Sequence, residues 1–181
     1  MLVLIGASAS GKTEVARQLV LQYGMNKIIT YTTRPMRHGE SNHKDYHFID
    51  GYHFDTLKQQ NFFLETTSYQ GHQYGTALED ANENTVIIVD PSGANAIYES
   101  IKDRVVIVLI QSPHDVRKKR MLKRGDLEEV IAKRLKSDEA TFNPSQLNHV
   151  DLIIENTNTR LDVLVRKIHM FYKKCLNSQS S

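Results

Sequence analysis

Residues 2–13, LVLIGASASGKT, decide the fold of this chain. Leu2 to Ile5 form an apolar run, which is typical of a strand buried on both faces of a sheet. Gly6 to Thr13 follow at once and fit the pattern G-x-x-x-x-G-K-[ST], a loop that wraps phosphate groups. Apolar residues recur at helical spacing from Val15 to Tyr23, so the pattern predicts a helix that begins near Lys12. Strand, loop and helix therefore occur in the order that the motif requires.

The residue types of this loop suit the binding of an anion. Glycines let the backbone curl so that N–H groups point at phosphate oxygens, and the following helix adds its own unpaired N–H groups. Lys12 is expected to reach the β- and γ-phosphates, and the hydroxyl of Thr13 to ligate Mg²⁺. The alternative is a turn rich in Gly and Ser that merely joins a strand to a helix, and the specificity of the motif disfavours it. The residues expected to surround the phosphate groups are Gly6, Ala7, Ser8, Ala9, Ser10, Gly11, Lys12 and Thr13.

Composition places the chain among ordinary globular proteins. It has 181 residues, of which 40% are hydrophobic and 24% charged, enough for one domain with a core. A net charge of +2 is too small to demand a nucleic-acid partner, and no apolar run reaches the length of a membrane span. A single cysteine, Cys175, excludes an intrachain disulfide and favours a reducing compartment. We expect a cytoplasmic protein with no membrane partner; a monomer and a small homo-oligomer both remain open.

Strand and helix patterns alternate along most of the chain. Apolar runs at 86–90, 105–110 and 151–155 predict buried strands, and a shorter run at 27–29 predicts another. Helical patterns separate them, at residues 93–101, 116–141 (interrupted at Gly125) and 161–176. This alternation predicts an α/β fold whose parallel sheet is covered on both faces.

Residues 30–76 are polar and favour β-structure, so we expect them to be inserted between the core strands. The expected elements of this insertion are an exposed loop at 30–40, a strand at 46–49, a helix at 54–62 capped by Asp55 or Thr56, and a hairpin turning at Gly71.

Several polar residues in these elements suit phosphate chemistry. Arg34 and Arg37 flank Pro35, and two guanidinium groups at this spacing suit a phosphate monoester, which hydroxyls of Tyr46 and Tyr74 could also contact. Asp90 follows four apolar residues, as in a Walker-B strand, although it could instead only form a turn before Pro91. The histidines at 38, 43, 47 and 53 show no spacing typical of zinc ligands.

The basic run at 117–124 has three interpretations. It is a solvated helix face, a nucleic-acid surface, or a lid whose arginines close over transferring phosphates. The acids Asp126, Glu128 and Glu129 argue against the nucleic-acid surface.

Taken together, these motifs resemble the guanylate kinases, which phosphorylate GMP with ATP. The resemblance covers nearly the whole chain and depends on motif order and spacing. The motifs are the phosphate loop, TTRPMR at 32–37 with Gly39-Glu40, DYHF at 45–48, FLE at 63–65, YGT at 74–76, and the stretch 120–134 with Arg124-Gly125 and Arg134-Leu135.

The resemblance implies the fold of P-loop nucleoside monophosphate kinases. This fold has a parallel core sheet of the five-stranded type flanked by helices, a small mixed β/α nucleotide-binding insertion and a helical lid. It implies an ATP-binding core at 1–29, 81–116 and 136–181, a GMP-binding insertion at 30–80 and a lid at 117–135, all within one domain.

The resemblance also implies roles for individual residues. The implied GMP ligands are Thr30, Arg34, Arg37, Tyr46, Glu65, Tyr74, Thr76 and Asp90. Arg120, Arg124 and Asn156 join the phosphate loop around ATP, with Mg²⁺ bound through Thr13. The implied catalytic residues are Lys12, Arg34, Arg120, Arg124 and Arg134. Guanine presents adjacent N1–H and N2–H₂ donors that one carboxylate can accept together, and adenine does not, so Glu65 would reject AMP.

Three positions depart from the family pattern. Ala9 stands where a glycine is usual and is expected to require a negative φ, Ile88 stands where an aspartate is frequent, and Thr30 replaces a serine. Two alternatives to a GMP kinase remain: a kinase of another nucleoside monophosphate, deoxy or modified, and a protein-interaction module without catalysis. The intact Gly11-Lys12-Thr13 disfavours the interaction module. The sequence does not distinguish ribose from deoxyribose, so both GMP and dGMP remain candidate substrates.

Overall fold

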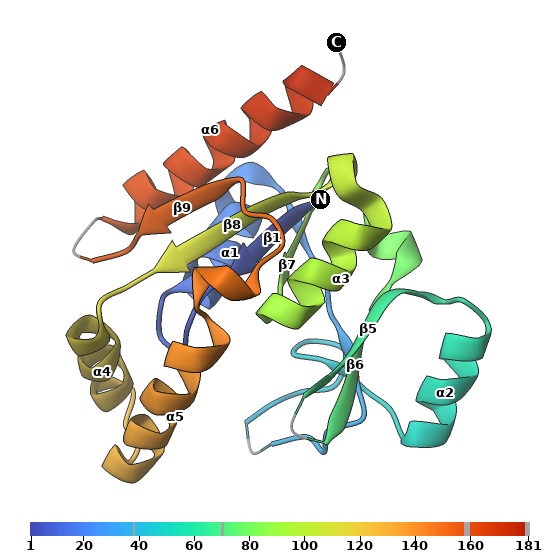
Figure 1. Cartoon of the computed structure of the whole chain (residues 1–181), viewed down its shortest axis with the longest axis horizontal. Helices are drawn as coiled ribbons and strands as arrows, with labels where there is room; N and C mark the ends of the chain where they lie inside the picture. Colours follow the sequence, from blue (N-terminus) through green and yellow to red (C-terminus); the bar gives the residue numbers. More distant parts are fainter. Residues whose placement is uncertain (38, 70, 158–159, 180–181) are drawn as a thin grey trace.

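The computed structural model describes residues 1–37, 39–69, 71–157 and 160–179, and its core is a five-stranded sheet in the order β2-β7-β1-β8-β9 (Figure 1). All neighbouring strands in this sheet are parallel. The strands are β1 (Leu2–Ile5), β2 (Asn26–Lys27), β7 (Thr85–Ile88), β8 (Val106–Gln111) and β9 (Leu152–Glu155). The predicted parallel α/β sheet is therefore confirmed, and β2 is displaced by one or two residues from the expected run at 27–29.

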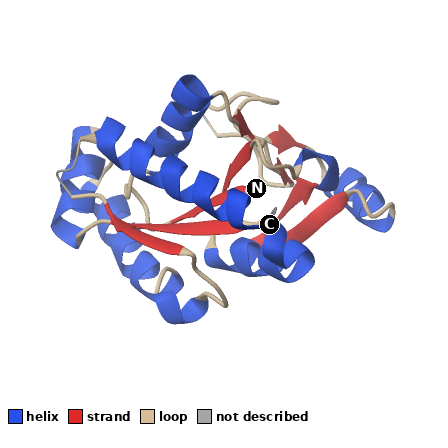
Figure 2. Cartoon of the chain, turned by 90° about the horizontal axis from the view of Figure 1, so that it is seen from above, coloured by secondary structure: helices blue, strands red, loops and turns tan. Residues whose placement is uncertain are grey.

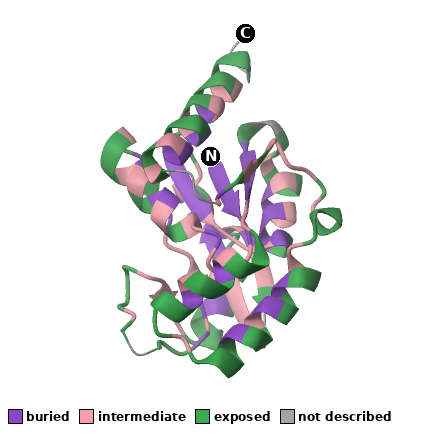
Figure 3. Cartoon of the chain, turned by 90° about the vertical axis from the view of Figure 1, so that its left-hand side faces the viewer, coloured by how far each residue is buried: buried purple, intermediate pink, exposed green. Residues whose placement is uncertain are grey.

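Helices cover both faces of this sheet because alternate residues of β1 point to opposite sides (Figure 2). Leu2 and Leu4 pack with α1 (Lys12–Tyr23) and α6 (Leu161–Gln179), whereas Val3 and Ile5 pack with α3 (Pro91–Ile101). Every residue of β1 is fully buried, as expected for an apolar strand covered on both faces. Figure 3 shows these strands as the buried centre of the molecule. Among the described residues, no helix has the length and apolar character needed to cross a membrane.

A second sheet of four strands lies to one side of the core, in the order β4-β3-β6-β5 (Figure 1). Its strands are β3 (Tyr31–Thr32), β4 (His47–Phe48), β5 (Phe63–Tyr69) and β6 (His72–Ala77), and α2 (Gly51–Gln59) connects β4 to β5. The helix predicted at 54–62 therefore begins and ends three residues earlier. Its cap is Asp50, not Asp55 or Thr56, because the carboxylate of Asp50 accepts the N–H of His53 at 2.8 Å.

The expectation of an exposed loop at 30–40 is wrong at two residues. Thr32 is fully buried and Arg34 is only 7% exposed. The hydroxyl of Thr32 donates to the carbonyl of Gln73 at 2.9 Å and accepts the N–H of Arg34 at 3.1 Å. Pairing of β3 with β6 thus draws the start of the polar stretch into the sheet.

The long helical pattern at 116–141 forms two helices, α4 (His114–Lys123) and α5 (Glu128–Thr141). They separate at Gly125, whose φ of 87° favours glycine. Met121 of α4 packs on Ile131 and Leu135 of α5, so the two helices form a small apolar cluster of their own. Short 3-10 helices complete the structure at Leu78–Asp80, Lys102–Arg104 and Pro144–Gln146.

Candidate active site

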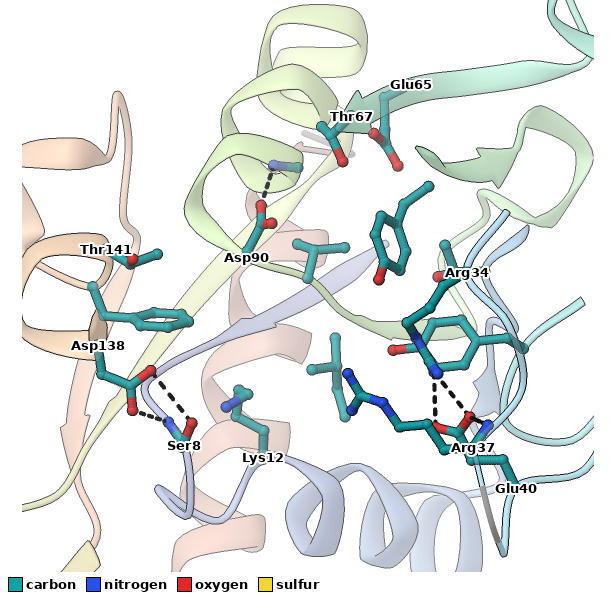
Figure 4. A pocket seen from close by; sticks show the side chains of 17 residues that line it. Ser8, Lys12, Arg34, Arg37, Glu40, Glu65, Thr67, Asp90, Asp138 and Thr141 are labelled. Carbon is teal, nitrogen blue, oxygen red and sulfur yellow. Dashed lines mark hydrogen bonds and ion pairs between the residues drawn. The ribbon is translucent and has the colours of Figure 1, made fainter. Parts of the chain in front are cut away.

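A cavity of about 310 Å³ lies between the loop after β1 and the second sheet (Figure 4). Five parts of the chain line it: the loop at 6–13, the second sheet with the loops beside it, the end of β7 with the two residues after it, the start of α3, and the end of α5. The lining residues are Ser8, Lys12, Thr30, Arg34, Arg37, Glu40, Tyr46, Glu65, Thr67, Tyr74, Ile88, Val89, Asp90, Gly93, Asp138, Thr141 and Phe142.

Close packing fixes the shape of the loop at 6–13. A Cβ on Gly6 would lie 2.2 Å from the carbonyl oxygen of Ile110, and a Cβ on Gly11 would lie 2.4 Å from Nδ2 of Asn156. Only glycine therefore fits either position without displacing a neighbour. The loop leads directly into α1, which begins at Lys12 as the sequence predicts.

Ala9 does not adopt the backbone conformation expected from the sequence. Its φ is +58°, so the prediction of a negative φ is wrong. The curled loop imposes this left-handed conformation, which costs a residue with a Cβ about 1–2 kcal/mol. The methyl group of Ala9 packs against the apolar cluster of α4 and α5, which offsets part of that cost.

Lys12 folds back over the loop. Its Nζ donates to the carbonyls of Gly6 and Ala7, at 2.5 and 2.9 Å. Desolvation lowers the pKa of Lys12 to about 8, while the carboxylate of Asp138 acts in the opposite direction. A cationic group is thereby held against main-chain oxygens at the edge of the cavity, where an incoming phosphate could replace them as its partner.

Two arginines extend from the loop after β3, and they are held differently. Nη2 of Arg34 contacts both carboxylate oxygens of Glu40, at 2.8 and 2.9 Å, and its guanidinium carbon lies 5.3 Å from the ring centre of Tyr46. Arg37 is exposed, and its guanidinium extends across the cavity toward Lys12 (Figure 4). Arg37 forms no ion pair with the described residues. Tyr74 completes this side of the cavity, with its ring 6.1 Å from that of Tyr46.

Glu65 is a buried carboxylate at the far end of the cavity. Its Oε1 accepts the hydroxyl proton of Thr76 at 2.7 Å, and its Oε2 has no partner among the described residues. Burial raises the pKa of Glu65 to about 7; the hydrogen bond from Thr76 opposes the rise and the charge of Asp90 adds to it. This site is therefore suited to a ligand that donates hydrogen bonds.

Asp90 caps a helix and also lines the cavity. Its Oδ1 accepts the N–H of Gly93 at 2.8 Å and caps α3, with Pro91 as the first residue of the helix. It also lines the cavity, at the carboxyl end of a parallel strand where ligands of α/β sheets are commonly found.

Eleven of the predicted residues do not line this cavity. Six belong to the loop, namely Gly6, Ala7, Ala9, Ser10, Gly11 and Thr13, and the other five are Thr76, Arg120, Arg124, Arg134 and Asn156. Arg120 donates to the carbonyl of Ala9 at 3.1 Å, and to Asn156, which in turn donates to the carbonyl of Ser10 at 2.8 Å. These two residues hold the back of the loop.

Arg124 and Arg134 both pair with Asp126, in the turn between α4 and α5. In this conformation the two guanidinium groups share one carboxylate, and neither arginine lines the cavity that contains Lys12.

Several residues that line the cavity are not predicted from the sequence, among them Thr67, Asp138 and Phe142. Thr67 follows Glu65 by two residues on β5, so the alternation of a strand could have placed both on one face. Asp138 offered no such signal, because one acid in a charged helix is ordinarily solvated.

A phosphate-binding loop at the edge of a parallel sheet, facing an arginine-lined pocket across one cavity, defines a P-loop phosphotransferase. The sequence pattern of the guanylate kinase family matches residues 1–174. Guanylate kinase from Neisseria meningitidis serogroup A is 31% identical over 162 residues, which cover 85% of this chain and 78% of that protein. Guanylate kinase from Thermus thermophilus is 34% identical over 163 residues, covering 86% and 73%. The chain therefore belongs to the guanylate kinase family.

A solved structure gives the same fold. The crystal structure of guanylate kinase from Anaplasma phagocytophilum superposes with a TM-score of 0.72, covering 96% of this chain and 84% of that one. Its sequence identity is 24%, so this likeness supports the fold, and the family assignment depends on the sequence matches.

Proposed function

We propose that this chain transfers the γ-phosphoryl group of ATP to GMP, giving ADP and GDP. The observation that carries the proposal is that Lys12, Arg37 and Glu65 line the same cavity. A donor phosphate at the loop, an acceptor phosphate at the arginines and a base at the carboxylate then lie along one continuous space. Such an arrangement favours direct transfer between two bound substrates.

Guanine is selected by Glu65. Its carboxylate accepts from N1–H and N2–H₂ of guanine, and the hydroxyl of Thr76 orients it. Adenine offers no such pair of donors and would leave a buried carboxylate oxygen without a partner, which costs roughly 1–3 kcal/mol. Thr67 and Asp90, which line the same region, contribute further polar contacts to the base.

The acceptor phosphate is held by guanidinium and hydroxyl groups. Arg37 supplies a guanidinium that forms no ion pair with the described residues, and Arg34 supplies one that is fixed in place by Glu40. Thr30, Tyr46 and Tyr74 lie beside them and offer hydroxyl donors. Charge-assisted hydrogen bonds of this kind favour a doubly charged phosphate.

The donor nucleotide is held by residues 6–13, with Mg²⁺ bound alongside its phosphates. Thr13 is exposed in the first turn of α1, where its hydroxyl can serve as one oxygen ligand of that ion. The ion, when bound, neutralises phosphate charge. Lys12 exchanges its main-chain acceptors for phosphate oxygens.

Transfer needs no nucleophilic side chain. An oxygen of the GMP phosphate forms a bond to the γ-phosphorus as the bond from that phosphorus to the β–γ bridging oxygen breaks, and ADP leaves with the electron pair. Lys12 stabilises the developing charge. This charge is also stabilised by Arg120, Arg124 and Arg134 when residues 117–135 close as a lid. The lid closes over the GMP-binding insertion at 30–80 and over the core, which is formed by residues 1–29, 81–116 and 136–181. Closure excludes water and limits hydrolysis of ATP.

A coupled assay of ADP release tests the proposal with GMP, dGMP, AMP, UMP and dTMP as acceptors. We expect turnover with GMP but not with AMP, UMP or dTMP. Turnover with dGMP as well is expected if the protein does not contact the 2′-hydroxyl of the ribose. Turnover with dTMP and not GMP would contradict the role of Glu65. No turnover with any of the five would favour an interaction module without catalysis.

A further inference from the structure

A carboxylate from α5 is bound to the phosphate loop. Oδ2 of Asp138 accepts the main-chain N–H of Ser8 at 2.9 Å, and Oδ1 accepts its hydroxyl at 3.3 Å. Asp138 is 7% exposed and lies at the boundary of the main cavity (Figure 4). An acidic group thus occupies two donors of a loop whose donors otherwise suit phosphate.

A buried arginine balances this charge. Nη1 of Arg117, on α4, donates to Oδ2 of Asp138 at 2.9 Å, and Arg117 is 6% exposed. One turn further along α4, Arg120 donates to the carbonyl of Ala9. In this conformation the two helices therefore contact consecutive residues of the loop, Ser8 through Asp138 and Ala9 through Arg120.

Stability alone does not account for the ion pair of Arg117 with Asp138. Replacing a buried ion pair by apolar residues of similar volume is often neutral or stabilising, because two charges must be desolvated to form it. Here desolvation is incompletely compensated, since Nε of Arg117 has no partner among the described residues. What distinguishes this ion pair is that its carboxylate also accepts the main-chain N–H and the hydroxyl of Ser8.

We propose that Asp138 is a positioning residue of the phosphate loop, acting through the N–H and hydroxyl of Ser8. It fixes the first half of the loop in the shape that receives the donor nucleotide, and Arg117 offsets its charge so that phosphates are not repelled. This inference rests on the proposed function only in assigning the loop to ATP. The reaction itself needs no step at Asp138.

Two double variants differ only in the acceptor offered to Ser8. Arg117→Met with Asp138→Asn removes both charges and keeps a side-chain oxygen for the Ser8 N–H. Arg117→Met with Asp138→Leu removes the charges and the oxygen at similar volume. Calorimetric titration with ATP measures donor binding without catalysis, and KM for ATP and for GMP are measured alongside.

We expect the Leu double variant to bind ATP about tenfold more weakly than the Asn double variant, the effect of one hydrogen bond that orders the site. The KM for GMP should differ little between the two. Equal ATP affinity in both variants would overturn the proposal. It would also be overturned if the Leu double variant lost ATP binding and GMP binding to the same extent, in proportion to a fall in its thermal stability. A parent protein that binds ATP but phosphorylates no nucleotide would instead contradict the proposed function.

Hydrogen exchange in the parent protein provides a second test that needs no variant to fold. The amide of Ser8, bonded to a buried carboxylate, should be protected by at least tenfold relative to an unbonded loop amide. Exchange of the Ser8 amide at the rate of an exposed loop would overturn the proposal.

Discussion

The hydroxyl of Thr76 donates a hydrogen bond of 2.7 Å to Oε1 of Glu65 and leaves Oε2 of the same carboxylate without a described partner. This asymmetry has two consequences. One oxygen is held in a fixed orientation, and the other is available to a ligand that donates hydrogen bonds. Because the carboxylate is buried, a ligand that cannot donate leaves the penalty of desolvation uncompensated.

Glu65→Gln should impair GMP use severely. An amide presents one acceptor and one donor to guanine, so one of the two adjacent donors of the base meets another donor. We expect kcat/KM for GMP to fall roughly a hundredfold, with ATP binding little changed. Steady-state kinetics with each substrate varied in turn measure this. Thr76→Ser keeps the hydroxyl and is the control; a similar loss there would indicate a packing effect.

The raised pKa of Glu65 predicts how stability depends on pH. A carboxyl group whose pKa rises from 4.5 to about 7 on folding binds its proton more tightly in the folded state. Its contribution to stability is therefore complete below pH 4.5 and is lost as the pH rises to about 7. The full loss is about 3 kcal/mol for the ligand-free protein.

Denaturant unfolding of the parent and of Glu65→Gln at pH 4, 5, 6, 7 and 8 (approximate steps suited to a carboxyl titration) tests this dependence. Glutamine does not titrate. The free energy of unfolding of the variant should therefore rise relative to that of the parent as the pH increases to about 7, and the difference should then stay constant. A constant difference between the two proteins would show that burial does not perturb Glu65.

Arg37→Ala and Arg34→Ala should separate binding from stability. Arg37 is exposed, so its loss should raise KM for GMP roughly tenfold or more and change the unfolding midpoint little. Loss of Arg34 also leaves Glu40 without its cation, and we expect a further cost in stability of roughly 2–3 kcal/mol. Kinetics and thermal unfolding of both variants check this. Equal destabilisation would contradict the different environments of the two arginines.

Lys12→Ala should abolish transfer and leave GMP binding largely intact. The lysine donates to the loop carbonyls of Gly6 and Ala7 and lies near the ring of Phe142, whereas most of the proposed GMP ligands lie on the second sheet or in the loops beside it. Single-turnover assays measure transfer and calorimetry measures GMP binding. Loss of GMP binding in this variant would show that the donor site is misplaced.

Ala9→Gly should stabilise the protein. Glycine adopts the φ of +58° without the cost of about 1–2 kcal/mol, while the half-buried methyl contributes less than about 0.8 kcal/mol. We expect a net gain of roughly 0.5–1 kcal/mol, which corresponds to an increase in Tm of about 1–4 °C. A lower Tm would mean that the methyl contact with the α4–α5 cluster dominates.

Much of the fold could be predicted because its signals are local. The run at 2–5 is apolar at every position, which favours a strand covered on both faces, and the motif after it requires a helix. Errors occurred where a distant partner overrides the local pattern. Arg34 reads as a solvated residue in a polar loop, yet pairing of β3 with β6 and contact with Glu40 bury it.

The sequence by itself determined the phosphate loop, the α/β alternation and the family, because each depends on short local patterns and on their order along the chain. Only the tertiary structure decided that Lys12, Arg37 and Glu65 share one cavity, that Arg124 and Arg134 pair with Asp126, and that Asp138 holds Ser8. Ser8 and Asp138 are separated by 130 positions, and no local pattern links them. Their contact exists because α5 packs beside the loop, and the position of α5 depends on the tertiary fold of the chain as a whole.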